Sequence, residues 1–540
     1  MSDCFFLASS ANVSWPITVV FAILLVGLVL TLALEEKIHA KKSIIAGSYA
    51  VVCLLLATFT GILSFEQIVV GSHKVTTSGE VGLEFSETVE ISYFPEGKVE
   101  STREFAVGES KEAAPEHSKD GEAATESHKV RDHHESIHVD GERIRTPVYI
   151  PGVDWSVIAI ILGSSLFVDV TSKSGLFTWI AIKVTKASGG DPLRLLYFYG
   201  FMTVVFSAVL NNVTAMIIVG SLTVVSLEKL EQRKLLLGFL LIEGLLTNIG
   251  GLLTLISSVP NIIVGTVAEI SFMTFFLKSA PFVLVSTILT LWLGSVLFKI
   301  KGLKGAVEKE HARELVDGFD ENDGVESWGF FKFATVMLIL FIIVIATTST
   351  LPGISKLGMG FVAMTFAVIM LWRYKSDVNR FYSAIDWDLL GFFMALFVVI
   401  YVMEHAMVLH SIGAGLQAIL SDITKMPANK MDATTLLCGS AVFSSVTDNI
   451  PLAAMFGNIL NDLGTPKDST LWWAVIFGAN LGGNITPIGS ASTLVAVTIM
   501  HKHKLPMAFM EFVKAAVPYA LIQIALAVVY VLFVLPLIPF

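Results

Sequence analysis

Two short stretches of the chain place polar side chains inside apolar runs, where those side chains could bind an ion. They are FSAVLNNVTAM (206–216) and FSSVTDNIPLAAM (443–455). Both begin Phe-Ser, and both carry a polar pair near the middle of the run. The candidate ion or substrate ligands in these stretches are Asn211, Asn212, Thr214, Asp448 and Asn449.

Asp448 is the residue with the most specific chemistry. An ionised carboxylate deep in a bilayer costs about 2.5–3.5 kcal/mol on insertion scales, so it normally faces a pathway or a partner. A carboxylate binds either Na⁺ or a proton, and an antiporter requires that competition. In the alternative interpretation, Asp448 only caps a helix by accepting backbone N–H groups.

Paired glycines interrupt two further apolar runs, at NIGG (248–251) and NLGG (480–483). They permit unwinding and a close approach of the backbone to an ion. Freed carbonyls at half-helix C-termini suit Na⁺, and freed N–H groups at half-helix N-termini suit anions. The alternative is that the glycines only allow tight helix packing. The candidate ligands in and after these breaks are Asn248, Asn480, Ser490, Ser492 and Thr493.

Glu243 lies one turn before the first glycine break and joins Asp448 as a candidate proton carrier. A neutral, structural glutamate is the alternative. No Lys or Arg occurs in either polar pair or either glycine break. An anionic substrate would therefore depend on helix dipoles or on co-bound Na⁺ for its counter-charge. We place the expected Na⁺ near Asn212, Thr214, Asp448 and Asn449, as a transported or coupling ion, and expect no other cofactor.

The composition indicates which class of protein holds these residues in place. Of the 540 residues, 54% are hydrophobic and 15% are charged, and the mean hydropathy is +0.73. A soluble chain of this length would need more polar surface. Several apolar stretches reach the roughly 20 residues that a membrane-spanning helix requires. We predict full spans at 17–34, 44–64, 154–170, 236–268, 272–299, 328–349, 356–374, 386–405, 471–500 and 508–537.

Three further features restrict the function classes. The first apolar run lacks the flanks of a cleaved signal peptide, and Cys4, Cys53 and Cys438 form no metal or disulfide framework. The net charge of -10 is mostly local, because 66–146 holds 18 acidic and 9 basic residues. We therefore predict no nucleic-acid partner. With no nucleophile–base pair either, we do not predict an enzyme.

An internal repeat organises the chain. DWSVIAIILG (154–163) is echoed by DWDLLGFFMA (386–395), and TNIGGLLTLISSVPN (247–261) by ANLGGNITPIGSAST (479–493). The two polar stretches recur between them in the same order, so three matched segments indicate a duplication. Lysine and arginine clusters stay on one side of the membrane only if 193–227 and 430–463 are re-entrant hairpins. The two copies are then inverted, as in many secondary transporters.

The predicted fold is an all-α polytopic membrane protein with two inverted repeats, each holding a re-entrant hairpin and a broken helix. Both hairpin tips would meet near the midplane, where polar side chains satisfy unpaired backbone groups. Both termini and a small polar, partly β insert would lie outside the cell membrane. The predicted segments are two N-terminal helices (1–65), the acidic insert (66–147), repeat 1 (148–299; hairpin 193–227, broken helix 236–268), a cytoplasmic linker (300–327) and repeat 2 (328–540; hairpin 430–463, broken helix 471–500).

From about residue 154 onward the chain resembles the ion transporter superfamily. The motifs that carry the resemblance are SAVLNNVT (207–214), TNIGG with VPNIIVG (259–265), SSVTDNIP (444–451) and LGGNITPIGSAST (481–493). The chain is most similar to the branch of NhaD-type sodium/proton antiporters, arsenite permeases and the melanosomal P protein, and more distantly to dicarboxylate and citrate carriers. The resemblance implies a scaffold domain that dimerises, elevator-type alternating access, and ligands at Asn212, Thr214, Asn449, Ser490 and Thr493.

Two departures from the family pattern concern the substrate. Many relatives have Asp-Asn in the first hairpin, where this chain has Asn211-Asn212. Many have a proline-rich loop after the first glycine break, where this chain reads SSVPN (257–261). The leading hypothesis is a Na⁺/H⁺ antiporter in the plasma membrane that works as a homodimer. The alternative is a Na⁺- or H⁺-coupled carrier of a dicarboxylate, citrate or arsenite-like anion.

Overall fold

The protein is described by a computed structural model. It describes residues 13–63, 66–70, 75–77, 93–94, 137–139, 142–146, 152–375, 378–379, 382, 385–421, 423–447, 449–505 and 507–538. The chain divides into two compact units, one of Met1–Ala11 with Gly61–Pro151 and one of Asn12–Thr60 with Gly152–Phe540.

The smaller unit contains short strands. In one sheet β1 (Glu66–Val70) pairs antiparallel with both β3 (Tyr93–Phe94) and β5 (Glu142–Thr146). In the other, β2 (Val75–Thr77) pairs antiparallel with β4 (Ile137–Val139). Most of the alternating segment 81–94, on which the expectation of β structure rested, lies outside the described residues.

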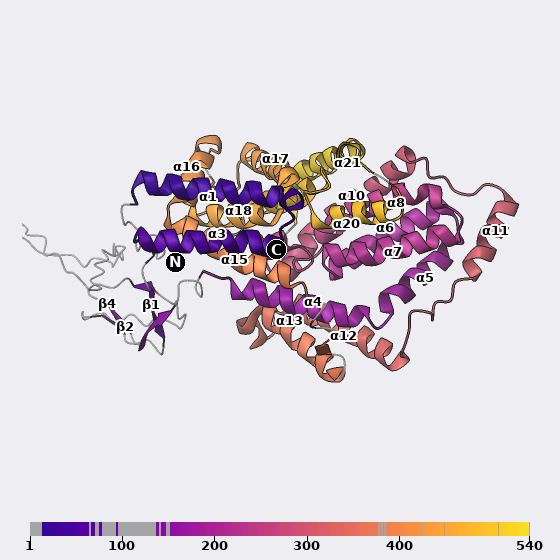
Figure 1. Ribbon diagram of the computed structural model, residues 1–540, viewed down its shortest axis with the longest axis horizontal. Coiled ribbons are helices and arrows are strands. Elements are labelled where there is room, and N and C mark those ends of the chain that lie inside the picture. The colour runs from indigo at the N-terminus through magenta and orange to yellow at the C-terminus, as the bar shows by residue number, and fades with distance from the viewer. Residues whose placement is uncertain are drawn as a thin grey trace, which may run out of the picture. The chain divides into compact units, whose positions relative to one another are not determined.

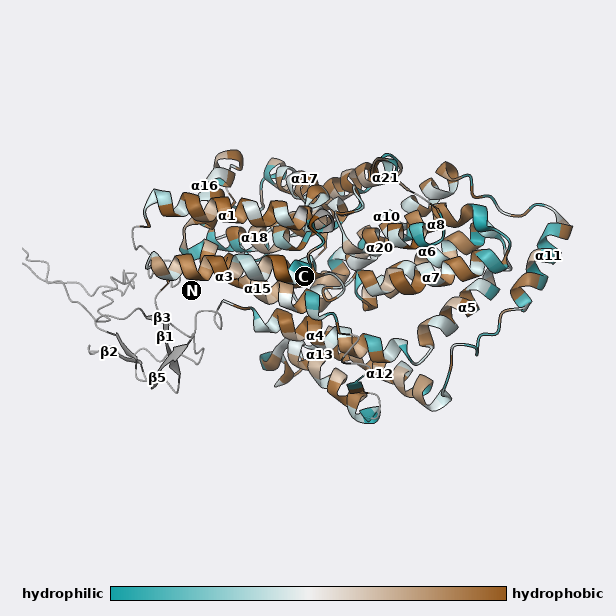
Figure 2. Cartoon of the chain, in the orientation of Figure 1, coloured by the Kyte–Doolittle hydropathy of each residue, from teal (hydrophilic) through white to brown (hydrophobic). Residues whose placement is uncertain are grey.

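The larger unit is helical (Figure 1). Among its described residues, eleven helices are long and apolar enough to cross a membrane. Figure 2 shows these helices largely in brown, and many of their large apolar side chains are exposed, as a lipid-facing surface requires. The prediction of an all-α polytopic membrane protein is therefore confirmed. Ahead of the first repeat lie α1 (Trp15–Ala33), α2 (Glu35–Ile38) and α3 (Lys42–Phe59).

Seven helices recur in the same order in the two halves, and the starts of matching helices are separated by a nearly constant offset. The first series is α4 (Trp155–Ser172), α5 (Leu176–Ser188), α6 (Pro192–Val209), α7 (Asn212–Lys229), α8 (Leu236–Gly251), α9 (Val259–Val267) and α10 (Phe272–Leu297). The second series is α15 (Trp387–His405), α16 (Val408–Ile419), α17 (Lys430–Val446), α18 (Asn449–Asp462), α19 (Thr470–Gly482), α20 (Ala491–Lys502) and α21 (Phe509–Val529). Between them lie α11 (Ala306–Asp317), α12 (Trp328–Thr347) and α13 (Ile354–Arg373).

The sequence patterns did not identify α5 and α16 as helices, because 13 and 12 residues are too few for a membrane span. The Asp-Trp pairs that open the repeated segments 154–163 and 386–395 begin helices in the structure. Asp154 accepts the backbone N–H groups of Ser156 and Val157, and Asp386 accepts that of Leu389. Both carboxylates therefore act as N-caps.

The two series exchange packing partners. The hairpin helix α7 packs on α20 of the other half, and its counterpart α18 packs on α9. In the same way α3 packs on α15, and α13 packs on α4. Such an exchange is what a two-fold relation between the halves requires. The direction in which each half faces the membrane and the depth of the hairpin tips stay predictions, since α6 and α7 are each long enough to cross.

Matching hydrogen bonds join each hairpin to the broken helix of its own half. Ser207 Oγ donates to the Thr247 carbonyl at 2.6 Å, and its counterpart Ser444 Oγ donates to the Ala479 carbonyl at 2.5 Å. Glycines at matching positions allow this contact. A Cβ at Gly250 would lie 2.7 Å from a carbonyl oxygen of α6, and one at Gly482 would lie closer still to a carbonyl oxygen of α17.

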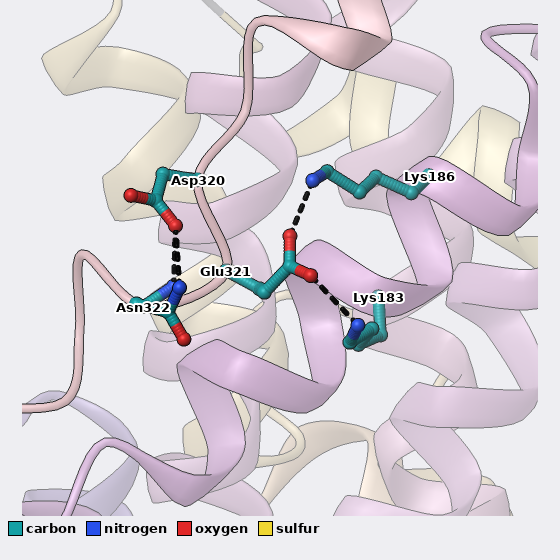
Figure 3. Close-up of polar contacts among 5 residues, drawn as sticks. All are labelled: Lys183, Lys186, Asp320, Glu321 and Asn322. Atoms are coloured by element: carbon teal, nitrogen blue, oxygen red, sulfur yellow. Dashed lines mark hydrogen bonds and ion pairs between the residues drawn. The ribbon is translucent and has the colours of Figure 1, made fainter.

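The linker between the repeats is attached to the ends of the first hairpin and of α5. Glu321 accepts hydrogen bonds from Lys183, at 2.7 Å, and from Lys186 (Figure 3). These lysines lower the pKa of the partly exposed Glu321 carboxyl to about 2. Leu303 N–H donates to Asp191, and the Lys229 ammonium lies 4.5 Å from the centre of the Phe319 ring. The linker therefore follows the surface of α5–α7.

We expect Gly482→Ala to lower the stability of the protein by roughly 1–3 kcal/mol, because the added methyl group meets main-chain atoms that cannot move away. Gly250→Ala should show a smaller loss, since its contact is less close. Thermal unfolding in detergent measures both. Gly439→Ala in α17 is the matched control, because its Cβ would meet nothing within 4 Å. Equal melting temperatures for all three variants would contradict this packing.

We expect Glu321→Gln to speed tryptic cleavage of the linker, because the variant loses both lysine contacts. Asp320→Asn is the control, because it replaces a neighbouring carboxylate that accepts hydrogen bonds from Asn322 and leaves the contacts of Glu321 with the lysines in place. The stabilisation by Glu321 is complete above its ordinary pKa of 4.5 and disappears as the pH falls towards 2. Because the side chain is partly exposed, high salt should weaken the effect. Equal cleavage of the two variants at pH 7 would contradict this role.

Candidate functional site

The two broken helices hold the candidate site. Chain segments 252–258 and 483–490 leave helical geometry between α8 and α9 and between α19 and α20. All of α8 except Leu237 is buried. Most residues of the two breaks are buried as well, so the backbone groups freed there need internal partners. Buried amides and hydroxyls supply these partners.

Asn248 is the centre of the larger cluster, the Asn248 cluster. Its side-chain oxygen accepts hydrogen bonds from Ser490 Oγ at 2.8 Å, Ser492 Oγ at 3.1 Å and Asn212 Nδ2 at 3.3 Å. Its Nδ2 donates to Asn484 Oδ1 at 2.8 Å. Asn248 and Asn484 are both fully buried. Four of the predicted ligands, from both halves of the chain, thus meet at one point.

Asn480 is the centre of a second cluster, which contains Asn261 and Ser258. Its Oδ1 accepts Ser258 Oγ at 2.7 Å, and its Nδ2 donates to Asn261 Oδ1 at 2.8 Å. Ser258 and Ser490 are counterparts in the two halves, at the same sequence offset as Asn248 and Asn480. Each serine therefore bonds the glycine-break asparagine of the other half, which is the same exchange of partners that the helices show.

The remaining predicted ligands have more local roles among the described residues. Asn211 is the N-cap of α7, where its Oδ1 accepts the Thr214 N–H at 2.7 Å. Thr493 Oγ1 donates to the carbonyls of Pro487 and Ser490 and so braces the start of α20. Asn449 is buried as the first residue of α18.

Asp448, the predicted ion ligand and proton carrier, lies outside the described residues. The second candidate proton carrier, Glu243, is 1% exposed. Its Oε1 accepts Thr223 Oγ1 of α7 at 2.6 Å, and its Oε2 has no hydrogen-bond partner among the described residues. Glu243 is thus a buried carboxyl group at the contact of α8 with the first hairpin.

Sequence reasoning did not select Asn261 and Asn484 of the two clusters, nor Gln523, which Asn484 Nδ2 bonds at 2.8 Å, nor Thr290, which Gln523 Nε2 bonds at 3.0 Å. Asn261 and Asn484 lie inside two motifs that carry the family resemblance, VPNIIVG and LGGNITPIGSAST, and their positions there could have indicated a role at the site. Gln523 and Thr290 lie deep in the apolar helices α21 and α10. A lone glutamine in a predicted span was the only signal for Gln523.

The clusters can bind a small charged species through neutral groups. Among the described residues, the hydrogen-bond partners within the clusters are amides, hydroxyls and backbone carbonyls. In the part of the chain that the structure describes, no three His, Cys, Asp or Glu residues lie close enough together to hold a metal ion. The N-terminus of α20 begins beside the Asn248 cluster, with Ser490 as its N-cap. A partial positive charge is available there for an anion.

The fold and its buried polar clusters define a multi-pass integral membrane protein. Residues 142–476 match the model of the citrate transporter family, and the chain belongs to this family of secondary transporters of small ions and anions. A relative in Mycobacterium leprae, described as a 46 kDa membrane protein, is 30% identical over 70% of this chain and 86% of its own. The mouse P protein is 23% identical over 74% of this chain and 56% of its own. The predicted resemblance is therefore confirmed.

One solved structure shares the fold. It is MtrF of Neisseria gonorrhoeae, described with a class of antimetabolite efflux pumps. The comparison gives a TM-score of 0.50 at 10% identity and covers 73% of this chain and 83% of the other. At this level of identity the comparison shows the fold alone.

We expect double-mutant cycles to reveal the exchange of serines between the halves. Ser258→Ala and Asn480→Ala should couple by roughly 0.5–1.5 kcal/mol in unfolding free energy, since each change breaks the same buried hydrogen bond. Ser490→Ala and Asn248→Ala should couple similarly. The control is the pair Ser258→Ala with Asn248→Ala, which share no contact and should be additive. Coupling in the control pair alone would contradict the assignment.

Proposed function

We propose that the protein is a secondary active ion transporter, and that Na⁺/H⁺ antiport is its reaction. The supporting observation is the Asn248 cluster. It joins residues of both halves beside a broken helix, it is buried, and its groups are neutral. Neutral oxygens bind a small cation without fixing it too strongly for release. They also leave room for one carboxylate to set the balance between the cation and a proton.

Asp448 is the proposed carboxylate, on the grounds of its sequence context. It directly precedes Asn449, whose counterpart Asn212 belongs to the Asn248 cluster. In the proposed cycle Na⁺ binds near Asn212, Thr214, Asp448 and Asn449 while Asp448 is ionised. Protonation of Asp448 then releases the ion. Glu243, buried and bonded to the first hairpin, is the second proposed proton carrier.

Alternating access completes the proposal. The hairpins and broken helices would move together against a scaffold as an elevator, in a homodimer of the plasma membrane with both termini outside the cell. The exchange of partners between the halves supports this, because two equivalent packings of related elements provide an inward-facing and an outward-facing state. Orientation, dimerisation and membrane type rest on the basic-residue pattern and on the resemblance.

A Na⁺- or H⁺-coupled anion carrier is the second candidate. Two observations favour it. The matching family model is described as a citrate transporter, and the N-terminus of α20 offers N–H groups beside the Asn248 cluster. Against it, no lysine or arginine among the described residues is a hydrogen-bond partner of the clusters, so none is there to neutralise a carboxylate substrate. Co-bound Na⁺ would have to provide that charge.

Reconstitution in liposomes with an internal pH dye distinguishes the two candidates. We expect a pulse of Na⁺ or Li⁺ alone to move protons, and Asp448→Asn to abolish this movement by removing the exchangeable charge. Asp320→Asn, which changes an exposed linker carboxylate, is the matched control and should keep the signal. Proton or Na⁺ movement that requires added citrate would favour the anion carrier. Full antiport by Asp448→Asn would rule out the proposed role of this carboxylate.

A further inference from the structure

A chain of buried amides runs from Asn248 away from the candidate ligands. Asn248 Nδ2 donates to Asn484 Oδ1 at 2.8 Å, and Asn484 Nδ2 donates to Gln523 Oε1 at 2.8 Å. Gln523 Nε2 then donates to Thr290 Oγ1 at 3.0 Å. These side chains are at most 2% exposed, so protein atoms alone satisfy them. The chain crosses from α8 through the second break to α21 and α10.

Every donor in this chain points the same way, from Asn248 towards Thr290. An amide has one donor end and one acceptor end, so fixing one link fixes the orientation of the neighbouring amides. The Thr290 hydroxyl can accept or donate, whereas the Leu245 carbonyl, which accepts from Asn484 Nδ2 at 3.3 Å, can only accept. Gln523 Oε1, at the shorter distance, and the Leu245 carbonyl together hold Asn484 with its oxygen towards Asn248.

The orientation of Asn248 decides what the site offers to a ligand. With Nδ2 committed to Asn484, Oδ1 faces the hydroxyls of Ser490 and Ser492 and accepts their protons. A hydroxyl that donates to Asn248 still has two lone pairs, and on Ser490 Oγ one of them accepts the Ser492 N–H at 3.3 Å while the other stays available. The serine oxygens can then present lone pairs to a cation. A reversed Asn248 would point N–H groups at both serines, and their protons would turn towards the ligand.

The other half of the protein has no equivalent chain among the described residues. Pro281 of α10 and Pro518 of α21 are counterparts, and the same sequence offset makes Ser286 the counterpart of Gln523. Ser286 Oγ has no hydrogen-bond partner in the part of the chain that the structure describes. At the offset that relates Asn248 to Asn480, the counterpart of Asn484 is the apolar Leu252. The amide chain therefore serves the Asn248 cluster specifically and is not a general feature of the repeat.

From these contacts we propose that Gln523 and Asn484 are positioning residues that orient Asn248 and thereby give the site its preference for a cation. Neither is assigned as a ligand. This inference rests on the proposed cation site, because it concerns how that site is prepared. Gln523 acts at a distance of two side chains from the ligand oxygens, through the orientation of the two asparagines.

The test uses the full-length protein, with NaCl as the probe and choline chloride keeping the ionic strength constant. Gln523→Met keeps the length of the side chain but removes both hydrogen bonds. We expect it to raise the half-saturating Na⁺ concentration about tenfold, the effect of one buried neutral hydrogen bond. Thr290→Val removes only the last acceptor and should give a smaller rise. Ser286→Ala is the matched control and should leave the value unchanged.

Two readouts separate positioning from a general loss of structure. Tryptophan fluorescence of the purified protein gives the half-saturating Na⁺ concentration, and liposome transport gives KM and the maximal rate. We expect KM to rise in Gln523→Met while the maximal rate stays within about twofold, whereas a loosened fold would lower the maximal rate and the melting temperature. If the wild-type protein responds to Na⁺ and both variants match it, the positioning role is overturned. If the wild-type protein does not respond to Na⁺, the proposed cation site itself is rejected, independently of the role of Gln523.

Discussion

Satisfying the backbone at the two helix breaks, inside an apolar protein, is the constraint on which the rest of this structure depends. Each break leaves N–H and C=O groups without intrahelical partners, and a buried unpaired group costs about 1–3 kcal/mol. Thr254 Oγ1 donates to a carbonyl of the first hairpin, and Thr486 Oγ1 to a carbonyl of the second. The breaks and the hairpins therefore stabilise each other, and neither would persist alone.

The pseudo-symmetry of the clusters follows from this mutual dependence. Because each glycine-break asparagine bonds a serine from the other half, the first broken helix is complete only when the second is folded. The contacts that close the fold are thus the contacts that build the candidate site. A movement that separates the halves would break both sets together, which favours rigid-body motion of the hairpins and broken helices as one group.

The sequence predicted much of this arrangement because its strongest signals are local. Glycine pairs, a polar pair inside an apolar run and the Asp-Trp starts recur at a nearly constant offset, and they located the helix breaks and most of the polar residues that meet in the two clusters. The hydrogen-bond partner of each of these residues could not be predicted, since pairing Asn248 with Ser490 requires the packing of helices from opposite halves of the chain. Gln523 was missed for the same reason, because its meaning depends on Asn484 lying beside it.

Departures from symmetry then distinguish the two clusters. The Asn480 amide is held by Asn261 of the other half and by the Ile476 carbonyl of its own helix, whereas the Asn248 amide is held by Asn484, which is bonded in turn to Gln523 and through it to Thr290. A duplicated fold needs only the matching contacts to be stable. Additional polar side chains that are fully buried cost free energy through the loss of their hydration, and apolar side chains in the same places would avoid that cost. Among the described residues, the extended chain to Gln523 and Thr290 occurs at the Asn248 cluster and not at the Asn480 cluster, which agrees with the proposal that the Asn248 cluster selects the ligand.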